Sequence, residues 1–422
     1  MQLMTENRVV PQLRLEGFEE NWKIINFNDI ADKGVKWSIT GGPFGSDLKS
    51  ENYTQNGVRI IQLQNIGDGI FNDKNKIYTS ESKADSLLAC NIYAGEIIIS
   101  KMGDPVARAC IMPLNSKRYL MSSDGIRFVP DAKKYDKQFI FQSINLPIFR
   151  KQAIRLSTGS TRKRIGLSEL KKISFTLPPL PEQQKIASFL SSVDEKLQQL
   201  TKKKDLLEEY KKGVMQQIFT QELRFKDDNG NNYPDWEEKK LGELCEFAKS
   251  GGTPKSTNKE YYNGNIPFLS ISDMTKQGKY LNYATKSISE EGVSNSSSWI
   301  VPVNTIIYSM YASVGFVAIN KIPIATSQAV INLGLNSNCN TEFIYYNLVE
   351  IKKIIHRFIE TGTQGNLNAQ TVKNLKIELP CLKEQDKIAN FLSSLDSKID
   401  LVSTQIENTN AFKKGILQQM FV

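Results

Sequence analysis

The chain has 422 residues, of which 40% are apolar and 9% aromatic, so ordinary buried cores and two or three domains are expected. No apolar run approaches the ~18 residues of a membrane span and no apolar signal core is seen, which predicts a cytoplasmic protein. The five cysteines include no C-x-x-C pair, which argues against a disulfide framework or zinc site and favours buried thiols. The net charge of +9 is only a weak indication of nucleic acid.

The first globular region is predicted to be a mixed α+β domain. Alternating apolar and polar residues predict a strand over 58–65, a second strand is expected over 96–102, and a helix over 139–154. Between Arg150 and Lys172, eight basic residues stand against one acid, a net charge of 8 − 1 = +7. That run is either a surface for nucleic acid or a solvated charged face, and the matching stretch of the second half is less basic.

A long helix is predicted to follow, over residues 182–219. Apolar side chains recur at alternating intervals of four and three from Ile186 to Ile218, broken only by Lys204 and Lys211, which indicates a coiled-coil stripe. Prolines at 178, 179 and 181 mark its start, and Glu182 places a carboxylate at the positive end of the helix dipole. At 1.5 Å per residue, about 38 residues form a rod of roughly 57 Å.

The second globular region repeats the frame of the first but carries different polar residues. Strands are expected at 266–273 and 304–310, each at an offset of 208 from its counterpart, and a helix over 343–359. At positions where the first region has arginine or glutamine, the aligned positions of the second region have proline or serine. Because forked side chains read base edges, this pattern is typical of two readers built on one scaffold and tuned to different targets.

The last segment, 384–421, repeats 182–219 at an offset of 384 − 182 = 202, with about 17 of 38 positions identical. The first helix leaves the first region and the second helix begins where the second region ends, so side-by-side packing requires them to be antiparallel. The alternative is that each helix packs only onto its own domain. The predicted fold is α+β: two globular domains, residues 1–178 and 223–380, separated by a long antiparallel two-helix coiled coil, residues 179–222 and 381–422, with pseudo-two-fold symmetry.

Motifs for catalysis are missing from the sequence. There is no P-loop, no Asn-Pro-Pro-Phe-type adenine methyltransferase motif and no glycine-rich cofactor loop after a strand. The single histidine, His356, lies in a basic run predicted to be helical, so we expect neither a histidine-based triad nor a multi-histidine metal site. We therefore expect no catalytic, cofactor-binding or metal-binding residue in this chain.

The paired helix starts carry a family resemblance. They read LPPLPEQQKIASFL (177–190) and LPCLKEQDKIANFL (379–392), and the helix ends read KKGVMQQIF (211–219) and KKGILQQMF (413–421). With the T-G-[ST] turns at Thr158 and Thr361, this arrangement resembles the specificity subunit of type I restriction-modification enzymes. A departure is Cys381 and Lys383, where the first copy has Pro179 and Pro181.

The resemblance implies a non-catalytic subunit with two target-recognition domains that reads a bipartite DNA site, two half-sites with a fixed unspecified gap. The implied partners are two modification subunits, which methylate adenine with S-adenosylmethionine, and restriction subunits, which use ATP and Mg. Two other classes remain open. A structural adaptor would use its antiparallel coiled coil only to bring partners together and would show no sequence-selective DNA binding. A self-contained nuclease or methyltransferase would act alone.

Three groups of candidate residues follow. Candidate phosphate contacts lie on loops and turns: Ser46, Thr158, Ser160, Arg162, Lys163, Arg164, Thr253, Thr361, Thr363, Gln364 and Asn366. Candidate base readers lie on or beside the expected strands: Arg59, Gln62, Gln64, Lys101, Arg108, Ser272, Ser309, Tyr311 and Gln328. Candidates for helix–helix or partner docking lie on the apolar stripes: Ile186, Phe189, Leu190, Leu197, Ile388, Phe391, Leu392 and Ile399.

Overall fold

The structure is a computed structural model that describes residues 10–358 and 366–421. Its internal contacts divide the chain into two compact units: unit 1 is Met1–Gln199 with Ile406–Val422, and unit 2 is Leu200–Gln405. Each unit thus holds one globular region and parts of both long helices. The segment boundaries expected at 178, 222 and 380 stay predictions. In the part of the chain that the structure describes, no helix is both long and apolar enough to cross a membrane.

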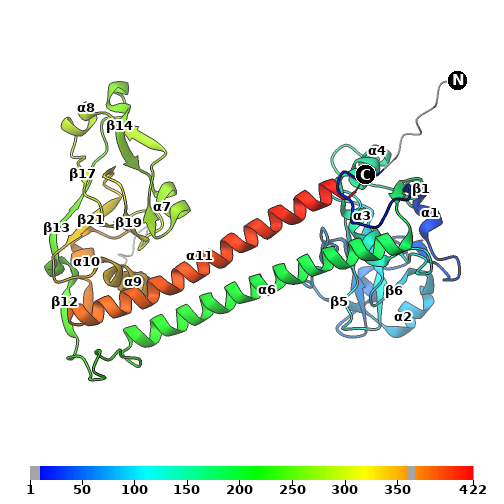
Figure 1. Ribbon diagram of the computed structural model, residues 1–422, viewed down its shortest axis with the longest axis horizontal. Helices are drawn as coiled ribbons and strands as arrows, with labels where there is room; N and C mark the ends of the chain where they lie inside the picture. The colour runs from blue at the N-terminus through cyan, green and yellow to red at the C-terminus, as the bar shows by residue number, and fades with distance from the viewer. Residues whose placement is uncertain (1–9, 359–365, 422) are drawn as a thin grey trace. The chain divides into compact units, whose positions relative to one another are not determined.

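The described part of unit 1 contains three sheets, and Figure 1 labels β1, β5 and β6 among their strands. An antiparallel pair joins β1 (Lys23–Asn26) and β11 (Ser174–Leu177). A four-stranded antiparallel sheet has the order β2 (Ile39–Gly41), β10 (Gly125–Phe128), β7 (Ile97–Ser100) and β8 (Ala109–Ile111). A five-stranded mixed sheet has the order β3 (Tyr53–Thr54), β5 (Ile77–Thr79), β4 (Val58–Ile61), β9 (Arg118–Met121) and β6 (Asn91–Tyr93).

The single helix expected over 139–154 is two helices. Leu146 is extended, with φ −77° and ψ 151°, because the ring of Pro147 disfavours the α conformation of the residue before it. The chain then starts a new helix at Pro147. The α-helices of unit 1 other than the long ones are α1 (Phe27–Ile30), α2 (Glu81–Ser86), α3 (Lys137–Asn145), α4 (Pro147–Leu156) and α5 (Leu167–Leu170).

Unit 2 repeats this plan. An antiparallel pair joins β12 (Glu237–Lys240) and β22 (Lys376–Leu379). A five-stranded sheet has the order β13 (Cys245–Ser250), β21 (Val330–Leu335), β18 (Ile306–Ser309), β19 (Val317–Asn320) and β15 (Tyr280–Leu281). A four-stranded sheet has the order β16 (Lys286–Ile288), β14 (Tyr262–Leu269), β20 (Ile324–Thr326) and β17 (Ile300–Val301).

The shorter helices of unit 2 complete the inventory. The helix expected over 343–359 ends earlier as an α-helix and continues as a 3-10 helix, and position 359 lies outside the described residues. The α-helices are α7 (Ile271–Gln277), α8 (Glu290–Ser294), α9 (Thr341–Ile351) and α10 (Ala369–Lys373). The 3-10 helices of the chain are η1 (Ser50–Asn52), η2 (Leu63–Asn65), η3 (Leu88–Cys90), η4 (Leu241–Leu244), η5 (Lys259–Tyr261) and η6 (Lys352–Phe358).

The strands expected over 58–65 and 266–273 both end about four residues early, because a cap starts a helix at each point. Beyond β4, the Asn65 side chain accepts a hydrogen bond from the Gln62 backbone N–H at 2.9 Å and closes η2. Beyond β14, the Ser270 hydroxyl accepts from the Asp273 N–H at 3.1 Å and starts α7. The polar residues that continued the alternation are therefore helix residues.

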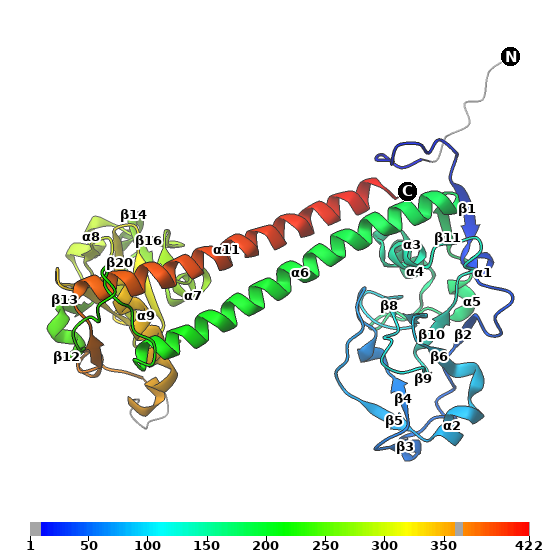
Figure 2. The ribbon, with the colours of Figure 1, turned by 60° about the horizontal axis from the view of Figure 1, so that its bottom comes forward.

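The two long helices are confirmed as α6 (Leu180–Phe219) and α11 (Leu382–Gln419). In unit 1 the start of α6 lies beside the end of α11, where the Phe189 and Phe412 rings are 6.4 Å apart (Figure 2). In unit 2 the end of α6 lies beside the start of α11, where Lys211 forms an ion pair with Asp396. The two helices are thus antiparallel within each unit, as predicted.

The identical residues of the repeat make the same contacts in both units. Glu182 is fully buried and accepts two hydrogen bonds from Arg14, each 2.8 Å long. Glu384 is likewise buried and accepts two from Arg224, each 2.9 Å long. Each carboxylate therefore anchors the segment that precedes its globular domain to the start of a long helix, in addition to facing the helix dipole.

The first turns of each long helix pack onto their own globular domain. Ile186 and Leu190 belong to the core of unit 1, and Ile388 and Leu392 to the core of unit 2. Residues of the other long helix pack there too, Leu417 of α11 in unit 1 and Ile218 of α6 in unit 2, so packing onto the globular domain and helix pairing occur together. Because the four candidates are buried, they are not available to a partner subunit. The remaining docking candidates are half-buried: Phe189, Leu197, Phe391 and Ile399.

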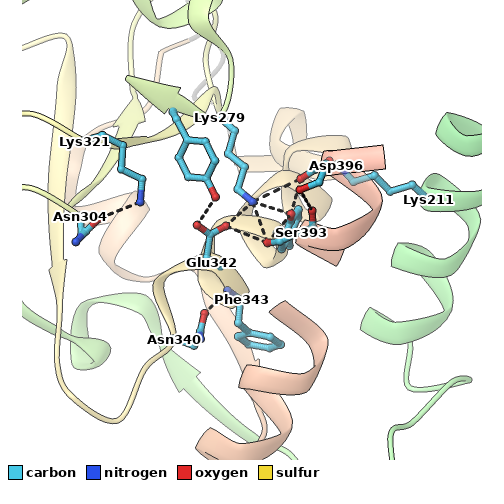
Figure 3. A network of polar contacts seen from close by, with 12 residues as sticks. Lys211, Lys279, Asn304, Lys321, Asn340, Glu342, Phe343, Ser393 and Asp396 are labelled. Carbon is cyan, nitrogen blue, oxygen red and sulfur yellow. Dashed lines mark hydrogen bonds and ion pairs between the residues drawn. The ribbon is translucent and has the colours of Figure 1, made fainter. Parts of the chain in front are cut away.

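A polar network fixes the start of α11 in unit 2. Figure 3 shows Lys279 reaching between Glu342 of α9 and Asp396 of α11, with Lys211 on the far side of Asp396. Lys279 also donates to the Tyr346 hydroxyl at 2.7 Å. Burial, and then the hydrogen bond to Asp396, raise the pKa of Tyr346, so the phenol stays protonated and donates.

The same place in unit 1 has a simpler arrangement. Asp194 forms an ion pair with Lys413, as Asp396 does with Lys211. Its second partner is the Gln142 amide, which donates at 3.5 Å. The helix pairing is therefore shared by the two units, whereas the surrounding polar contacts differ.

Candidate nucleic-acid interface

The basic loop of unit 1, residues 158–164, is a closed turn. Thr158 and Arg164 exchange backbone hydrogen bonds of 2.8 and 2.9 Å, which hold the intervening residues at the tip. Gly159 has φ +95°, and a side chain there would place its Cβ 2.6 Å from the Arg162 carbonyl oxygen. Glycine is therefore required at this position. Five predicted phosphate contacts are exposed on this loop: Thr158, Ser160, Arg162, Lys163 and Arg164.

Backbone hydrogen bonds fix this basic loop against the end of β7. The Ile165 N–H donates to the Lys101 carbonyl at 2.8 Å, and the Gly103 N–H donates to the Lys163 carbonyl at 3.3 Å. Arg164 also forms an ion pair with Asp124 at 3.3 Å. Residues about sixty positions apart in the sequence are thereby held together, and the positive charges of the loop lie beside a predicted base reader, Lys101.

Two clefts adjoin this loop. The glutamine cleft has a volume of about 510 Å³ and is lined by Pro43, Phe44, Gly45, Leu48, Tyr53, Gln62, Leu63, Gln64, Arg108, Ser122, Ser123 and Asp124. The loop cleft has a volume of about 590 Å³ and is lined by Leu63, Met102, Gly103, Asp104, Val106, Ile154, Ser160, Thr161, Arg162 and Lys163. Leu63 borders both clefts. The structure thus brings three predicted base readers of unit 1 next to the basic loop.

Gln62 and Gln64 form one side of the glutamine cleft. The Gln64 amide donates to the Gln62 side-chain oxygen at 2.9 Å, so each amide orients the other. Arg108 is half-buried in the same cleft. Paired amides and a guanidinium are groups that can form two parallel hydrogen bonds with adenine or guanine in the major groove. Ser46, a predicted phosphate contact, is exposed in the turn directly after the residues that line this cleft.

Lys101 lies half-buried behind the cleft. Its ammonium group donates to the Ser123 carbonyl at 2.7 Å. Burial, and then repulsion from Arg164, lower the pKa of Lys101 below its usual value, while Asp124 acts in the opposite direction. This lysine therefore holds the 122–124 segment in place, and its ammonium is already occupied by one carbonyl.

Two predicted base readers are buried instead of exposed. The Arg59 side chain is 7% exposed, forms an ion pair with Asp73 and lies over the Phe71 ring at 5.2 Å. Ser309 is fully buried, and its hydroxyl donates to the carbonyls of residues 311 and 312 at 2.8 Å each. The physical reason is shared: β4 and β18 are buried on both faces, so alternation along the strand does not bring a side chain to the surface.

The remaining predicted contact residues of unit 2 that the structure describes carry no charge. The Thr253 hydroxyl donates to the Gln328 side-chain oxygen at 2.7 Å, and both residues are exposed. Tyr311 is 41% exposed, and its N–H donates to the carbonyl of residue 329 at 3.3 Å, which places it near Gln328. Asn366 is half-buried, and Ser272 is exposed on α7. Three further candidates lie outside the described residues: Thr361, Thr363 and Gln364.

The basic run of unit 1 also contains a structural residue. Arg150 is buried and bonded to Asp68 and Asn145 at 2.6 Å each, so it holds α4 in place and adds little to the surface charge. Phe44 and Tyr53 also line the glutamine cleft, and neither is among the contacts predicted from the sequence. An aromatic residue within the glycine-rich turn 41–46 was the available signal for Phe44.

Metal and thiol chemistry has little support in the parts of the chain that are described. Residues 10–358 and 366–421 contain no group of three or more His, Cys, Asp or Glu side chains that could hold a metal ion. Of the five cysteines, Cys110 is buried, and burial raises the pKa of its thiol to about 12. Cys381 is exposed, so the expectation that all cysteines are buried is wrong for this one.

Comparison with known proteins agrees with this organisation. Two stretches, residues 19–209 and 233–410, match the family model described as type I restriction modification DNA specificity domain. The chain belongs to this family. Each matched stretch contains one globular region and most of one long helix, so the internal repeat is a repeat of the family's domain.

Individual relatives share the specificity-subunit description. The chain is 24% identical over 413 residues to the putative type I restriction enzyme MjaX specificity subunit of Methanocaldococcus jannaschii, covering 94% of this chain and 92% of that protein. It is 30% identical over 210 residues to the MjaIX specificity subunit of the same organism, covering 48% of each. The crystal structure of a type I S subunit from M. genitalium shares the fold, with a TM-score of 0.59, 18% identity and coverage of 98% and 99%.

Proposed function

We propose that this specificity subunit binds a bipartite DNA site, with one half-site read by each unit and a fixed unspecified gap between them. The observation that carries the proposal is the glutamine cleft with the basic loop at its side in unit 1. Support also comes from unit 2, where an equivalent frame presents Thr253, Gln328 and Tyr311 in place of glutamine and arginine. Different polar groups on one frame are suited to different half-sites.

The roles divide between phosphate and base contacts. Arg162, Lys163 and Arg164 carry three positive charges on a loop whose backbone is already fixed, so they are suited to phosphates and set the register. Gln62 and Arg108 lie in the adjacent cleft and are suited to base edges. Buried Arg59 could take part only by supporting this surface of unit 1, and buried Ser309 only by supporting the surface of unit 2.

The proposed assembly assigns catalysis to other subunits. Two modification subunits would methylate adenine with S-adenosylmethionine, restriction subunits would use ATP and Mg, and this chain would bind no cofactor and work in the cytoplasm. For docking of the modification subunits we propose the exposed aromatic side chains of the long helices. Tyr210 is 53% exposed and Phe412 is 51% exposed, and they occupy equivalent positions of the repeat, since 412 − 210 = 202.

The first experiment tests sequence selectivity. The chain with its modification subunits is incubated with a random-site DNA library, and bound DNA is sequenced. The expected result is enrichment of two short specified blocks at one fixed separation. Binding without enrichment would favour the alternative, a non-catalytic coiled-coil adaptor, whereas methyl transfer by the purified chain alone would revive a self-contained methyltransferase.

A charge-reversal experiment tests the basic loop. The variant R162E/K163E/R164E should bind DNA more weakly, and the slope of log K against log salt should fall by up to about 2.7, from about 0.9 for each of three phosphate contacts. The matched control reverses three exposed lysines that line neither cleft, K74E/K117E/K133E, and changes the net charge equally. Equal effects of the two variants on the slope would remove the loop from the interface.

A pull-down experiment tests the docking surface. The double variant Y210A/F412A should lose co-purification with the modification subunits while its thermal unfolding falls only slightly, because both side chains are about half exposed and Phe412 loses one edge contact, with Phe189. Leu114→Ala, which truncates an 82% exposed side chain away from the long helices, is the control. Disruption of Phe189 and Phe391 without loss of partner binding would also count against docking on the helix pair.

A further inference from the structure

Phe44 is an apolar side chain with no structural reason for its exposure. It is 84% exposed, the highest value for a large apolar residue in the part of the chain that is described. It also lines the glutamine cleft, together with Gln62, Gln64 and Arg108. A phenylalanine ring held in water beside hydrogen-bonding groups costs solvation free energy, which a ligand with an apolar group would recover.

The turn that carries Phe44 is held in place by its neighbours. The Gly42 N–H donates to the Gly125 carbonyl at 2.8 Å, and a Cβ on Gly42 would lie 1.8 Å from the Ser122 carbonyl oxygen. The Asp47 N–H closes the turn on the Phe44 carbonyl at 2.9 Å. Because the backbone is already ordered, contact through the ring requires little further loss of chain entropy.

The chemistry of the major groove limits what such a ring can contact. Gln62, Gln64 and Arg108 are suited to base edges in that groove, and this step rests on the proposed DNA-binding function. Among the groups displayed there, the C5-methyl of thymine is the apolar one. Insertion of the ring between base pairs would require unstacking, which costs a few kcal/mol per step. Contact with a methyl group requires no deformation of the duplex.

We propose that Phe44 is a specificity-determining residue that contacts the C5-methyl group of a thymine in the half-site read by unit 1. The equivalent turn of unit 2, Gly251-Gly252-Thr253-Pro254, has proline where unit 1 has phenylalanine. The thymine contact therefore belongs to unit 1, and the two half-sites differ in their dependence on a methyl group.

The test replaces each thymine of both half-sites, one at a time, with deoxyuridine, which lacks only the methyl group. The enriched site from the library is used, with the chain in complex with its modification subunits. At one position the replacement should weaken wild-type binding about 4-fold, the equivalent of about 0.8 kcal/mol for one buried carbon. Phe44→Ala should weaken binding to the thymine site by a similar factor. The affinity of this variant should not change when deoxyuridine replaces thymine at that position.

Controls and outcomes separate this inference from the proposed function. Leu114→Ala, an equally exposed truncation outside the cleft, should keep the wild-type response, and Phe44→Leu should keep part of it. The thymine contact would be overturned if the losses of binding free energy caused by Phe44→Ala and by deoxyuridine were additive at every position. It would also be overturned if the enriched site contained no A·T pair. In both cases selective DNA binding would still stand. A rise in the fluorescence of 2-aminopurine placed in the half-site, seen only when Phe44 is present, would show that the ring inserts between base pairs. That result would also overturn the proposed methyl contact. Absence of any selective binding would overturn the proposed function as well.

Discussion

Removal of Arg14 should destabilise unit 1 more than removal of Arg224 destabilises unit 2, although the two arginines hold equivalent glutamates. Glu182 and Glu384 are both fully buried, while Arg14 is 16% exposed and Arg224 is 25% exposed. Breaking a buried ion pair from one side costs about 3–5 kcal/mol, because the remaining charge stays buried without its partner. Partial exposure of the arginines places both variants toward the lower end of that range.

The difference between the two units comes from a tryptophan. The Trp236 indole N–H donates to Glu384 at 3.1 Å, so this carboxylate keeps one donor when Arg224 is removed. The indole nitrogen of the corresponding Trp22 is buried and has no hydrogen-bond partner among the described residues. A hydrogen bond to a charged group contributes about 1.5–3 kcal/mol. We therefore expect Arg14→Ala to cost about 3–4 kcal/mol and Arg224→Ala about 2 kcal/mol.

Amide hydrogen exchange read by mass spectrometry is the appropriate assay, because a chain with two units need not unfold in one step. Peptides from β1 and α3 report the opening free energy of unit 1, and peptides from β12 and α9 report that of unit 2. The double variant Arg224→Ala with Trp236→Phe should lower the opening free energy of unit 2 by as much as Arg14→Ala lowers that of unit 1, apart from the loss of the indole's packing. Equal costs for the two single arginine variants would refute the reasoning.

Three further predictions concern other parts of the molecule. The hydrogen bond from Arg59 lowers the pKa of Asp73 below its usual 3.8. The ion pair therefore stabilises the folded state above about pH 4, and this stabilisation is lost as the pH falls through the lowered pKa. Asp73→Asn should make the melting temperature fall less steeply on acidification. Gly42→Ala should displace its turn and weaken DNA binding about 10-fold, measured by fluorescence anisotropy, because the added Cβ would lie 1.8 Å from a carbonyl oxygen. Leu392→Ala should cost about 2–5 kcal/mol in thermal unfolding, whereas Leu401→Ala, at a 60% exposed position of the same helix, should cost under about 0.5 kcal/mol.

The long helices could be predicted from the sequence because their signals are local. The apolar repeat sets the helical face, prolines mark the starts, and the offset of 202 shows that both copies share one register. The observed starts at Leu180 and Leu382 lie within two residues of the predicted ones. The antiparallel direction followed from chain connectivity, which is also readable from the sequence.

The candidate site could be predicted only in part, because its shape depends on contacts between distant segments. Alternation suggested that Arg59 faces outward, yet β4 is covered on both faces, and no local pattern reveals the second covering layer. The basic run suggested a surface at Arg150, which instead closes a buried hydrogen-bonding site. Exposure of Arg162 to Arg164 agrees with the loop composition, whereas their position beside Lys101 required the fold.

The composition of unit 1 has a consequence for biosynthesis. Its core includes Met420, and the Phe139 ring stacks on Phe421 at a centroid distance of 5.0 Å. Domains generally begin to fold on the ribosome in the order in which they are translated. Here the amino-terminal domain must wait, with an unfilled apolar site, until every residue of unit 2 has been translated. A stop codon that removed only the last turn of α11 would therefore damage the part of the protein that was made first.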